Sequence, residues 1–183
     1  MRTRLICSFV AMMGLPGGPA YAQDPGKVGI TMGFPASIGV LWHATDSLAL
    51  RPEFTFSGGS SEFDGTGVIE TDNWSIATGA SVLFYLKKHD NLRTYVTPRI
   101  AYTRTESTTT LSSFTNTTTR NATNSLGAFG SFGAQYNLGD KFGVFGELGF
   151  GVTRARVRGG FSGSESTSTQ WGTRAGVGVV YYP

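Results

Sequence analysis

Several segments of the chain alternate apolar residues with small or polar ones, and aromatic residues about ten positions apart bracket the apolar positions. One such segment runs from Trp171 to Tyr181, and another runs from Trp74 to Phe84. A period of two is the signature of a β-strand with two different faces. Roughly 9–11 tilted residues between aromatic ends is the length of a strand that crosses a bilayer. The pattern therefore predicts a transmembrane β-barrel.

The N-terminus has the features of a secretory signal. A basic start precedes the apolar segment 5–15, and Ala20-Tyr21-Ala22 forms a small-x-small cleavage site. The apolar segment is too short to span a membrane as a helix. We therefore expect 1–22 to be a signal peptide and 23–183 to be the barrel domain, exported to a bacterial outer membrane.

Composition argues against several classes of function. The single cysteine, Cys7, lies inside the expected signal, so the mature chain has no disulfide and no cysteine metal site. The formal charge of +3 falls to +1 once Arg2 and Arg4 leave with the signal, because 13 basic and 12 acidic residues remain. This balance gives no support for nucleic-acid binding. Since no His, Asp and Glu cluster has metal-ligand spacing, we expect no metal and no cofactor.

Alternation and turn residues predict eight strands, at 27–34, 37–43, 48–57, 72–86, 92–105, 122–138, 141–156 and 168–182. Short turns are expected at 44–47, at 87–91 and, as a Gly-Asp hairpin turn, at 139–140. Long polar loops are expected at 58–70, 106–121 and 157–167. Outer-membrane barrels have short periplasmic turns and longer extracellular loops. The sequence thus predicts an all-β, eight-stranded antiparallel up-and-down transmembrane β-barrel with both termini in the periplasm. The alternative at 27–43 is one kinked strand, which would give seven.

Charged residues occupy the alternate positions opposite the apolar ones, where a barrel has its lumen. An arginine facing lipid at mid-membrane costs about 2–4 kcal/mol, whereas an eight-stranded barrel has an interior just wide enough for side chains. We therefore expect a lumen charge network of Arg51, Glu53, Arg99, Glu147 and Arg174, with Tyr85, Tyr95, Phe129 and Phe145 filling the remaining space. An ion path through these charges is the alternative.

Aromatic residues at the strand ends are expected at the membrane interfaces. They are Trp42, Trp74, Phe84, Tyr102, Tyr136, Trp171 and Tyr181. Three arginines, Arg154, Arg156 and Arg158, share the outward positions at the outer end of the seventh strand. Contact with anionic outer-leaflet lipid and a solvated loop base are two open interpretations of these arginines.

Leu48-Ala49-Leu50-Arg51-Pro52-Glu53 resembles the second hairpin of small outer-membrane barrels, and Gly176 to Tyr182 is similar to their C-terminal assembly strand. Together with the signal and the eight amphipathic strands, these segments resemble the family that includes the membrane domain of OmpA, OmpX and Ail. The resemblance covers the whole mature chain. It implies adhesion, serum resistance or envelope integrity, and recognition of the C-terminal strand by the barrel-assembly machinery. Here Pro183 follows the final aromatic residue.

Some small barrels act on lipid A with a histidine and a serine near the outer rim. The histidines of this chain, His43 and His89, both lie beside turns expected in the periplasm. A general base must lie within hydrogen-bond reach of its nucleophile, and the serine-rich outer loops contain no histidine. We therefore expect no enzymatic activity.

Taken together, these features favour a non-catalytic outer-membrane protein with a structural or adhesion and interaction role. Its expected partners are outer-membrane lipid and lipopolysaccharide, the barrel-assembly machinery, and host or surface ligands bound through 58–70, 106–121 and 157–167. A soluble lipocalin-like barrel that binds an apolar ligand, and a narrow pore, are the alternatives. A soluble barrel would place its apolar residues inside, so the position of the apolar face distinguishes the first alternative.

Overall fold

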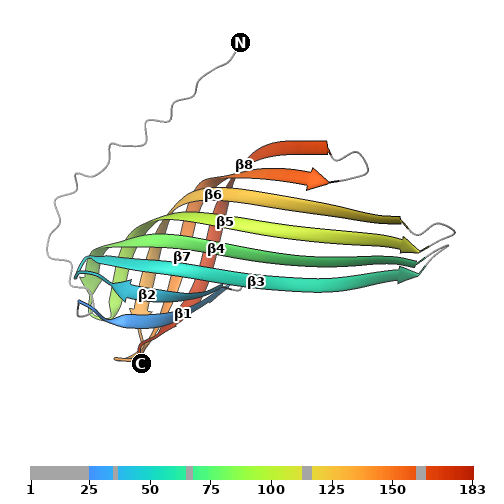
Figure 1. Ribbon diagram of the computed structural model, residues 1–183. Helices are drawn as coiled ribbons and strands as arrows, with labels where there is room; N and C mark the ends of the chain where they lie inside the picture. Colours follow the sequence, from blue (N-terminus) through green and yellow to red (C-terminus); the bar gives the residue numbers. More distant parts are fainter. Residues whose placement is uncertain (1–24, 35–36, 65–67, 113–116, 160–163) are drawn as a thin grey trace, which may run out of the picture.

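The computed structural model describes residues 25–34, 37–64, 68–112, 117–159 and 164–183, so the expected signal peptide at 1–22 lies outside the described residues. Each strand pairs antiparallel with the next along the chain, and β1 pairs with β8 to close the barrel (Figure 1). The strands are β1 (Val28–Phe34), β2 (Ser37–His43), β3 (Leu48–Asp64), β4 (Val68–His89), β5 (Leu92–Ser112), β6 (Thr117–Asn137), β7 (Phe142–Gly159) and β8 (Ser164–Tyr181). The expected all-β, eight-stranded up-and-down barrel is therefore confirmed.

The first hairpin consists of two strands, not one kinked strand. β1 and β2 pair in a continuous register from Val28 opposite Trp42 to Gly33 opposite Ser37. Apolar side chains alternate on both strands, so the two strands present one apolar face together. Because this hairpin contributes two strands, the barrel has eight. β1 closes the barrel by pairing with β8.

The long loops expected at 58–70, 106–121 and 157–167 are wrong in their described parts, which are strand. β3 and β4 stay paired as far as Asp64 opposite Val68, and β5 and β6 as far as Leu111 opposite Thr117. The threonines and serines of these hairpins have no apolar alternation, which is why they resemble loops in the sequence. Threonine nevertheless favours strands, and cross-strand hydroxyl pairs such as Ser75 with Thr105 (2.9 Å) join neighbouring strands.

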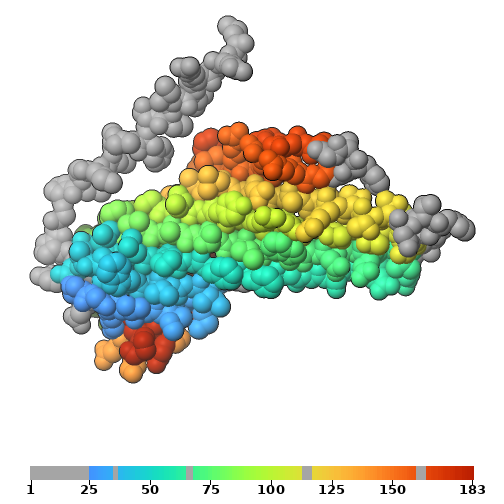
Figure 2. Space-filling model, in the orientation of Figure 1, coloured from blue at the N-terminus to red at the C-terminus, as the bar shows by residue number. Residues whose placement is uncertain are grey.

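Because β1 and β2 have seven residues each while β3 to β8 have 17 or more, six strands extend beyond the closed barrel. Figure 1 shows β3 to β6 running well past β1 and β2, and Figure 2 shows the same extension as a continuous slab. We call this six-stranded part the protruding sheet, and the end of the barrel that carries it the hairpin end. The opposite end is called the turn end.

Short connections and the C-terminus lie together at the turn end. One connection centres on Asp90, whose φ of 51° is left-handed, a conformation that aspartate tolerates in turns. The two-residue turn expected at 139–140 is wrong, because β6 ends at Asn137 and β7 begins at Phe142. The amide of Leu138 donates to the carbonyl of Phe142 (2.8 Å), which closes this wider turn.

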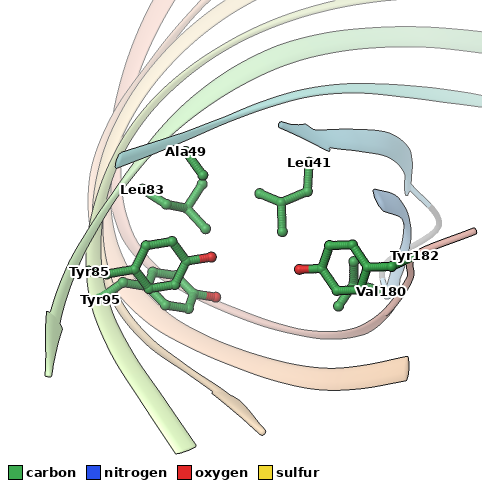
Figure 3. Close-up of a cluster of buried hydrophobic side chains, with 7 residues drawn as sticks. All are labelled: Leu41, Ala49, Leu83, Tyr85, Tyr95, Val180 and Tyr182. Carbon is green, nitrogen blue, oxygen red and sulfur yellow. The ribbon is translucent and has the colours of Figure 1, made fainter. Parts of the chain in front are cut away.

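The outer face of the barrel is apolar, and the inner face is polar or closely packed. On this outer face, Leu148, Ile100, Leu126 and Val177 are each 60–66% exposed. Buried inside, at the turn end, is the cluster of Leu41, Ala49, Leu83, Tyr85, Tyr95, Val180 and Tyr182 (Figure 3). The described part of the chain has no helix long and apolar enough to cross a membrane. An outward apolar face is the reverse of the soluble lipocalin-like arrangement.

Candidate functional site

Four of the five charges expected in the lumen form one connected network. Arg51, with a side chain only 2% exposed, lies 2.6 Å from Glu147 and 3.4 Å from Glu53 through its Nη2 and Nε atoms. Glu53 also pairs with Arg99, and the hydroxyl of Tyr95 donates to Oε1 of Glu147 (2.8 Å). The network therefore joins residues of β3, β5 and β7 across the lumen.

The fifth residue, Arg174, lies in the lumen but outside this network. Its guanidinium stacks over the ring of Phe129 at 5.7 Å, and it has no ion pair with a described carboxylate. Glu147 is opposite Gly176 in the β7–β8 register, and Arg174 is opposite Gly149, two positions nearer the hairpin end. This offset along the strands separates Arg174 from Glu147, although both side chains point into the lumen.

A second layer, nearer the turn end, closes the lumen with tyrosines. Tyr85 and Tyr95 lie side by side, and Tyr182 lies across the lumen from them (Figure 3). Gln135 connects the two sides, because its Oε1 accepts from the hydroxyl of Tyr85 (3.4 Å) and its Nε2 donates to the hydroxyl of Tyr182 (3.3 Å). His43 shares a further hydrogen bond with Tyr182 (3.0 Å). The sequence pattern placed Tyr85 and Tyr95 in the lumen, but it did not predict that Tyr182, Gln135 and His43 complete this layer.

Glycines on the inward face provide room for these rings. A Cβ at Gly133 would lie 2.5 Å from Cε2 of Tyr95, and a Cβ at Gly178 would lie 2.5 Å from Cζ of Phe145. Both distances are shorter than any real carbon contact. Glycine is therefore frequent at the inward-facing positions of the strands because aromatic rings approach the backbone closely in a narrow barrel.

On the hairpin side of the charge network the lumen widens into a cup of about 400 Å³. Arg99, Arg174 and Phe129 line it, together with hydroxyl side chains such as Thr55 and Thr103. The charge network and the tyrosine layer separate this cup from the turn end. Among the described residues, no group of three or more His, Cys, Asp or Glu side chains could hold a metal ion.

Aromatic residues form two groups on the outer face. Trp42, Phe84, Tyr136 and Tyr181 lie towards the turn end, and Trp74, Tyr102 and Trp171 lie towards the hairpin end. Rings that the sequence prediction omitted join both groups. Phe142 contacts Tyr181 with ring centroids 6.3 Å apart, and Phe150 stacks on Trp171 at 6.1 Å. The outward parity of both phenylalanines is visible in the sequence.

The protruding sheet has two edges without a neighbouring strand in the described structure. β3 pairs with β2 only as far as Phe54, while its pairing with β4 continues to Asp64. β8 pairs with β1 only from Val177 onwards, although its pairing with β7 begins at Ser164. We call residues 56–64 the β3 edge and residues 164–176 the β8 edge. Along each edge, the alternate backbone N–H and C=O groups that point away from the sheet are available to an added strand.

Neither histidine accompanies a serine at the hairpin end. His43 is buried in the tyrosine layer, and His89 is exposed at the last residue of β4, with its Nε2 3.8 Å from Oδ2 of Asp90. Both lie at the turn end, as expected from their positions in the sequence. The described part of the chain therefore places no histidine base beside the serines of the protruding sheet.

No family model matches the chain, and its sequence shows no significant similarity to a curated protein. Its structure is similar to that of a major outer membrane protein from Thermus thermophilus, with a TM-score of 0.57 and 14% identity over 85% of this chain and 98% of that one. CarO of Acinetobacter baumannii aligns with a TM-score of 0.47 and 14% identity, over 87% of this chain and 98% of its own. The closed barrel of this chain agrees with its structural similarity to the Thermus thermophilus protein. The chain has the fold of an outer-membrane β-barrel.

Proposed function

We propose that this protein is an integral protein of a bacterial outer membrane which binds other proteins, without catalysis, through the edges of its protruding sheet. The main observation behind this proposal is that two strand edges at the hairpin end, the β3 edge and the β8 edge, have no neighbouring strand in the described structure. The signal at 1–22 would export the chain, and the barrel-assembly machinery would recognise β8. A narrower relationship to the OmpA, OmpX and Ail barrels is part of this proposal.

The apolar outer face supports the membrane placement. Large side chains such as Leu148 and Val177 are more than half exposed around the middle of the barrel, and aromatic rings lie towards both ends. Such a belt on a soluble barrel would promote aggregation, whereas lipid covers it in a membrane. Short turns belong on the periplasmic side, so the hairpin end with its protruding sheet faces the outside.

The filled lumen argues against the narrow-pore alternative. Arg51, Tyr95 and Tyr182 are almost completely buried and lie in two successive layers across the barrel. An eight-stranded barrel has an interior just wide enough for such side chains. These layers lie between the cup at the hairpin end and the turn end.

The two edges differ from the edges that soluble proteins protect. Natural edge strands are commonly blunted by lysine, proline or a bulge, or are covered by another element. The β3 edge contains Gly58-Gly59-Ser60-Ser61, and the β8 edge is rich in serine and threonine. Neither edge contains a lysine or a proline. An extended partner segment can therefore add a strand, with main-chain hydrogen bonds supplying affinity.

A test of edge pairing uses the protein folded in detergent micelles and a synthetic peptide of alternating threonine and valine. We expect the peptide to slow amide hydrogen exchange along the β3 edge or the β8 edge, and not along β5. An N-methylated peptide of the same sequence is the matched control, because it lacks the backbone donors that a strand needs. Equal effects of the two peptides, or no slowing at either edge, would refute edge pairing.

Proline substitution at the β3 edge supplies a second arm of the test. Neighbouring N–H groups on a strand point to opposite sides, so Ser60→Pro and Ser61→Pro remove different hydrogen bonds. We expect one variant to weaken pairing with β4. The other should keep the fold and lose the peptide's protection of this edge. Retained protection in both variants would contradict the assignment.

A further inference from the structure

A group of arginines gathers on the outer face of the protruding sheet, on the side formed by β5 to β8. The register of the neighbouring strands shows that these arginines share the outward face. Asn124 of β6 lies between Arg104 of β5 and Arg156 of β7, and Ala122 of β6 is opposite Arg158 of β7. Two strand spacings, about 10 Å, therefore separate Arg104 from Arg156. We call Arg104, Arg120, Arg154, Arg156 and Arg158 the arginine patch.

Two glutamates share four of these guanidinium groups. Glu106 pairs with Arg104 and Arg120, and hydrogen bonds from Arg104 and then Arg120 hold the pKa of Glu106 below its usual value. This carboxylate lies at the hairpin-end rim of the apolar belt, opposite Trp74 in the β4–β5 register.

The second glutamate and an unshared arginine complete the charge balance. Glu165 lies 2.9 Å from Arg156 and 3.2 Å from Arg158. Arg154 is exposed and has no ion pair with a described carboxylate. Five positive and two negative charges therefore give this face a surplus of three positive charges. The four paired arginines are still 50–69% exposed, which leaves N–H donors free for a ligand.

The patch directly adjoins the apolar belt. Arg154 is opposite Leu126 in the β6–β7 register, and Leu126 is opposite Tyr102 in the β5–β6 register. Val152 lies two residues before Arg154 on β7, towards the turn end, and is opposite Trp171 in the β7–β8 register. A ligand with anionic groups and acyl chains on the same molecule would therefore contact both surfaces. A soluble anionic ligand would use only the arginines.

Charge is unevenly distributed over the protruding sheet, with the positive surplus on the β5–β8 side. The outward positions of the neighbouring β3–β4 hairpin carry only acidic side chains among their charged residues: Glu62, Asp64, Glu70 and Asp72. A merely solvated surface normally intersperses both signs. Arginine is also the side chain best suited to phosphate, because its planar fork donates two parallel hydrogen bonds.

We propose that the arginine patch binds the phosphate groups of an outer-leaflet glycolipid of the lipid A type, whose acyl chains lie against Leu126 and Val152. The proposal rests on the membrane placement proposed above, and not on edge pairing. The lipid would fix the height of the barrel in the membrane on the β5–β8 side. The acidic β3–β4 hairpin would remain outside the lipid contact.

The test is native mass spectrometry of the protein, folded in non-ionic detergent and titrated with lipid A. The triple variant Arg154→Gln/Arg156→Gln/Arg158→Gln removes the β7 part of the patch. The matched control, Lys87→Gln/Lys88→Gln, removes positive charge at the turn end. One arginine near an anionic lipid surface changes binding by about fivefold, so the triple variant should lose at least about tenfold in affinity. The control should bind as the unmodified protein does.

Two further ligands distinguish a lipid site from a simple anion site. Lipid A stripped of its phosphates should bind at least about tenfold more weakly than intact lipid A. Inorganic phosphate should not displace the lipid, because it lacks the acyl chains. Equal binding of the two lipids, displacement by phosphate alone, or equal affinity of the triple variant would each overturn the proposal.

Folding is checked separately in every variant by the change in gel mobility on heating. The single variant Arg154→Gln removes the arginine of the patch that has no ion pair with a described carboxylate, so it leaves the glutamate pairs intact. It should fold and still lose part of the affinity. A protein that never inserts into membranes would refute the membrane placement, whereas inserted protein with unchanged lipid binding would refute the patch alone.

Discussion

Replacing Arg51 by methionine should destabilise the barrel more than any surface charge substitution. The change keeps an unbranched side chain of similar length and removes the guanidinium. Glu53 would keep its pair with Arg99, but Glu147 would keep only the hydrogen bond from Tyr95. The buried carboxylate of Glu147 would thus lose its charge partner in the lumen.

The magnitude follows from burial. Breaking a buried ion pair by removing one partner costs about 3–5 kcal/mol, whereas an exposed pair contributes about 0–1 kcal/mol. The side chains of Arg51 and Glu147 are 2% and 8% exposed, which places this pair in the buried class. Arg158→Met is the matched control, since Arg158 and its partner Glu165 are 61% and 44% exposed.

A double-mutant cycle isolates the pair itself. In Arg51→Met/Glu147→Gln the glutamine carbonyl still accepts from Tyr95, so the variant has no unpaired charge at position 147. We expect a coupling of about 2 kcal/mol between the two substitutions, within the range seen for contacting residues.

The assay is urea unfolding of the protein in detergent micelles, followed by tryptophan fluorescence. All three tryptophans lie on the outer face, so none of them touches the substituted site. The free energy of unfolding in water follows from linear extrapolation. A loss below about 1 kcal/mol for Arg51→Met, or strictly additive single variants, would refute the buried-network account.

Three further predictions concern other parts of the chain. Gly133→Ala should cost about 1–3 kcal/mol because its Cβ would overlap Tyr95, whereas Gly130→Ala, with open space around the position, should be neutral in the same unfolding assay. Val177→Arg places a charge in the middle of the apolar face and should cost about 2–4 kcal/mol, measured as a lower fraction folded into lipid vesicles. Since the pKa of Glu106 lies below its usual value, the contribution of its ion pairs to stability is complete above the ordinary pKa and is lost as the pH falls through the lowered one. The protection of backbone amides in the β5–β6 hairpin, measured as exchange corrected for its intrinsic pH dependence, should therefore fall in acid, and unchanged protection would contradict the assignment.

The residue pattern predicted the barrel well because its two faces differ so clearly. The alternation assigned Arg51 and Glu147 to the lumen, and their pairing followed from the cost of an unpaired buried charge. Register was beyond the pattern, which is why Arg174 was expected in the ion-pair network and instead stacks on Phe129. A period of two shows which face of the sheet a side chain is on, but it does not show which residue of the neighbouring strand lies opposite.

The protruding sheet was missed for a different reason. Segments such as 106–112 lack apolar alternation because both faces meet water, so strand and loop have the same polar composition there. Pairing between neighbours decides the outcome, as in the long continuous register from Leu92 to Leu111 on β5. The arginine patch shows the same limit. The outward parity of Arg154 was visible, but its approach to Arg104 depends on two strand registers.

The most direct test of the central claim is the position and mobility of the protein in fractionated cells. Membrane fractions are run on an SDS gel with boiled and unboiled samples side by side. A closed barrel embedded in the outer membrane should resist unfolding without heat, so the protein should be found in the outer-membrane fraction and should change mobility on boiling. Recovery in the soluble periplasmic fraction, with no change in mobility, would contradict the account.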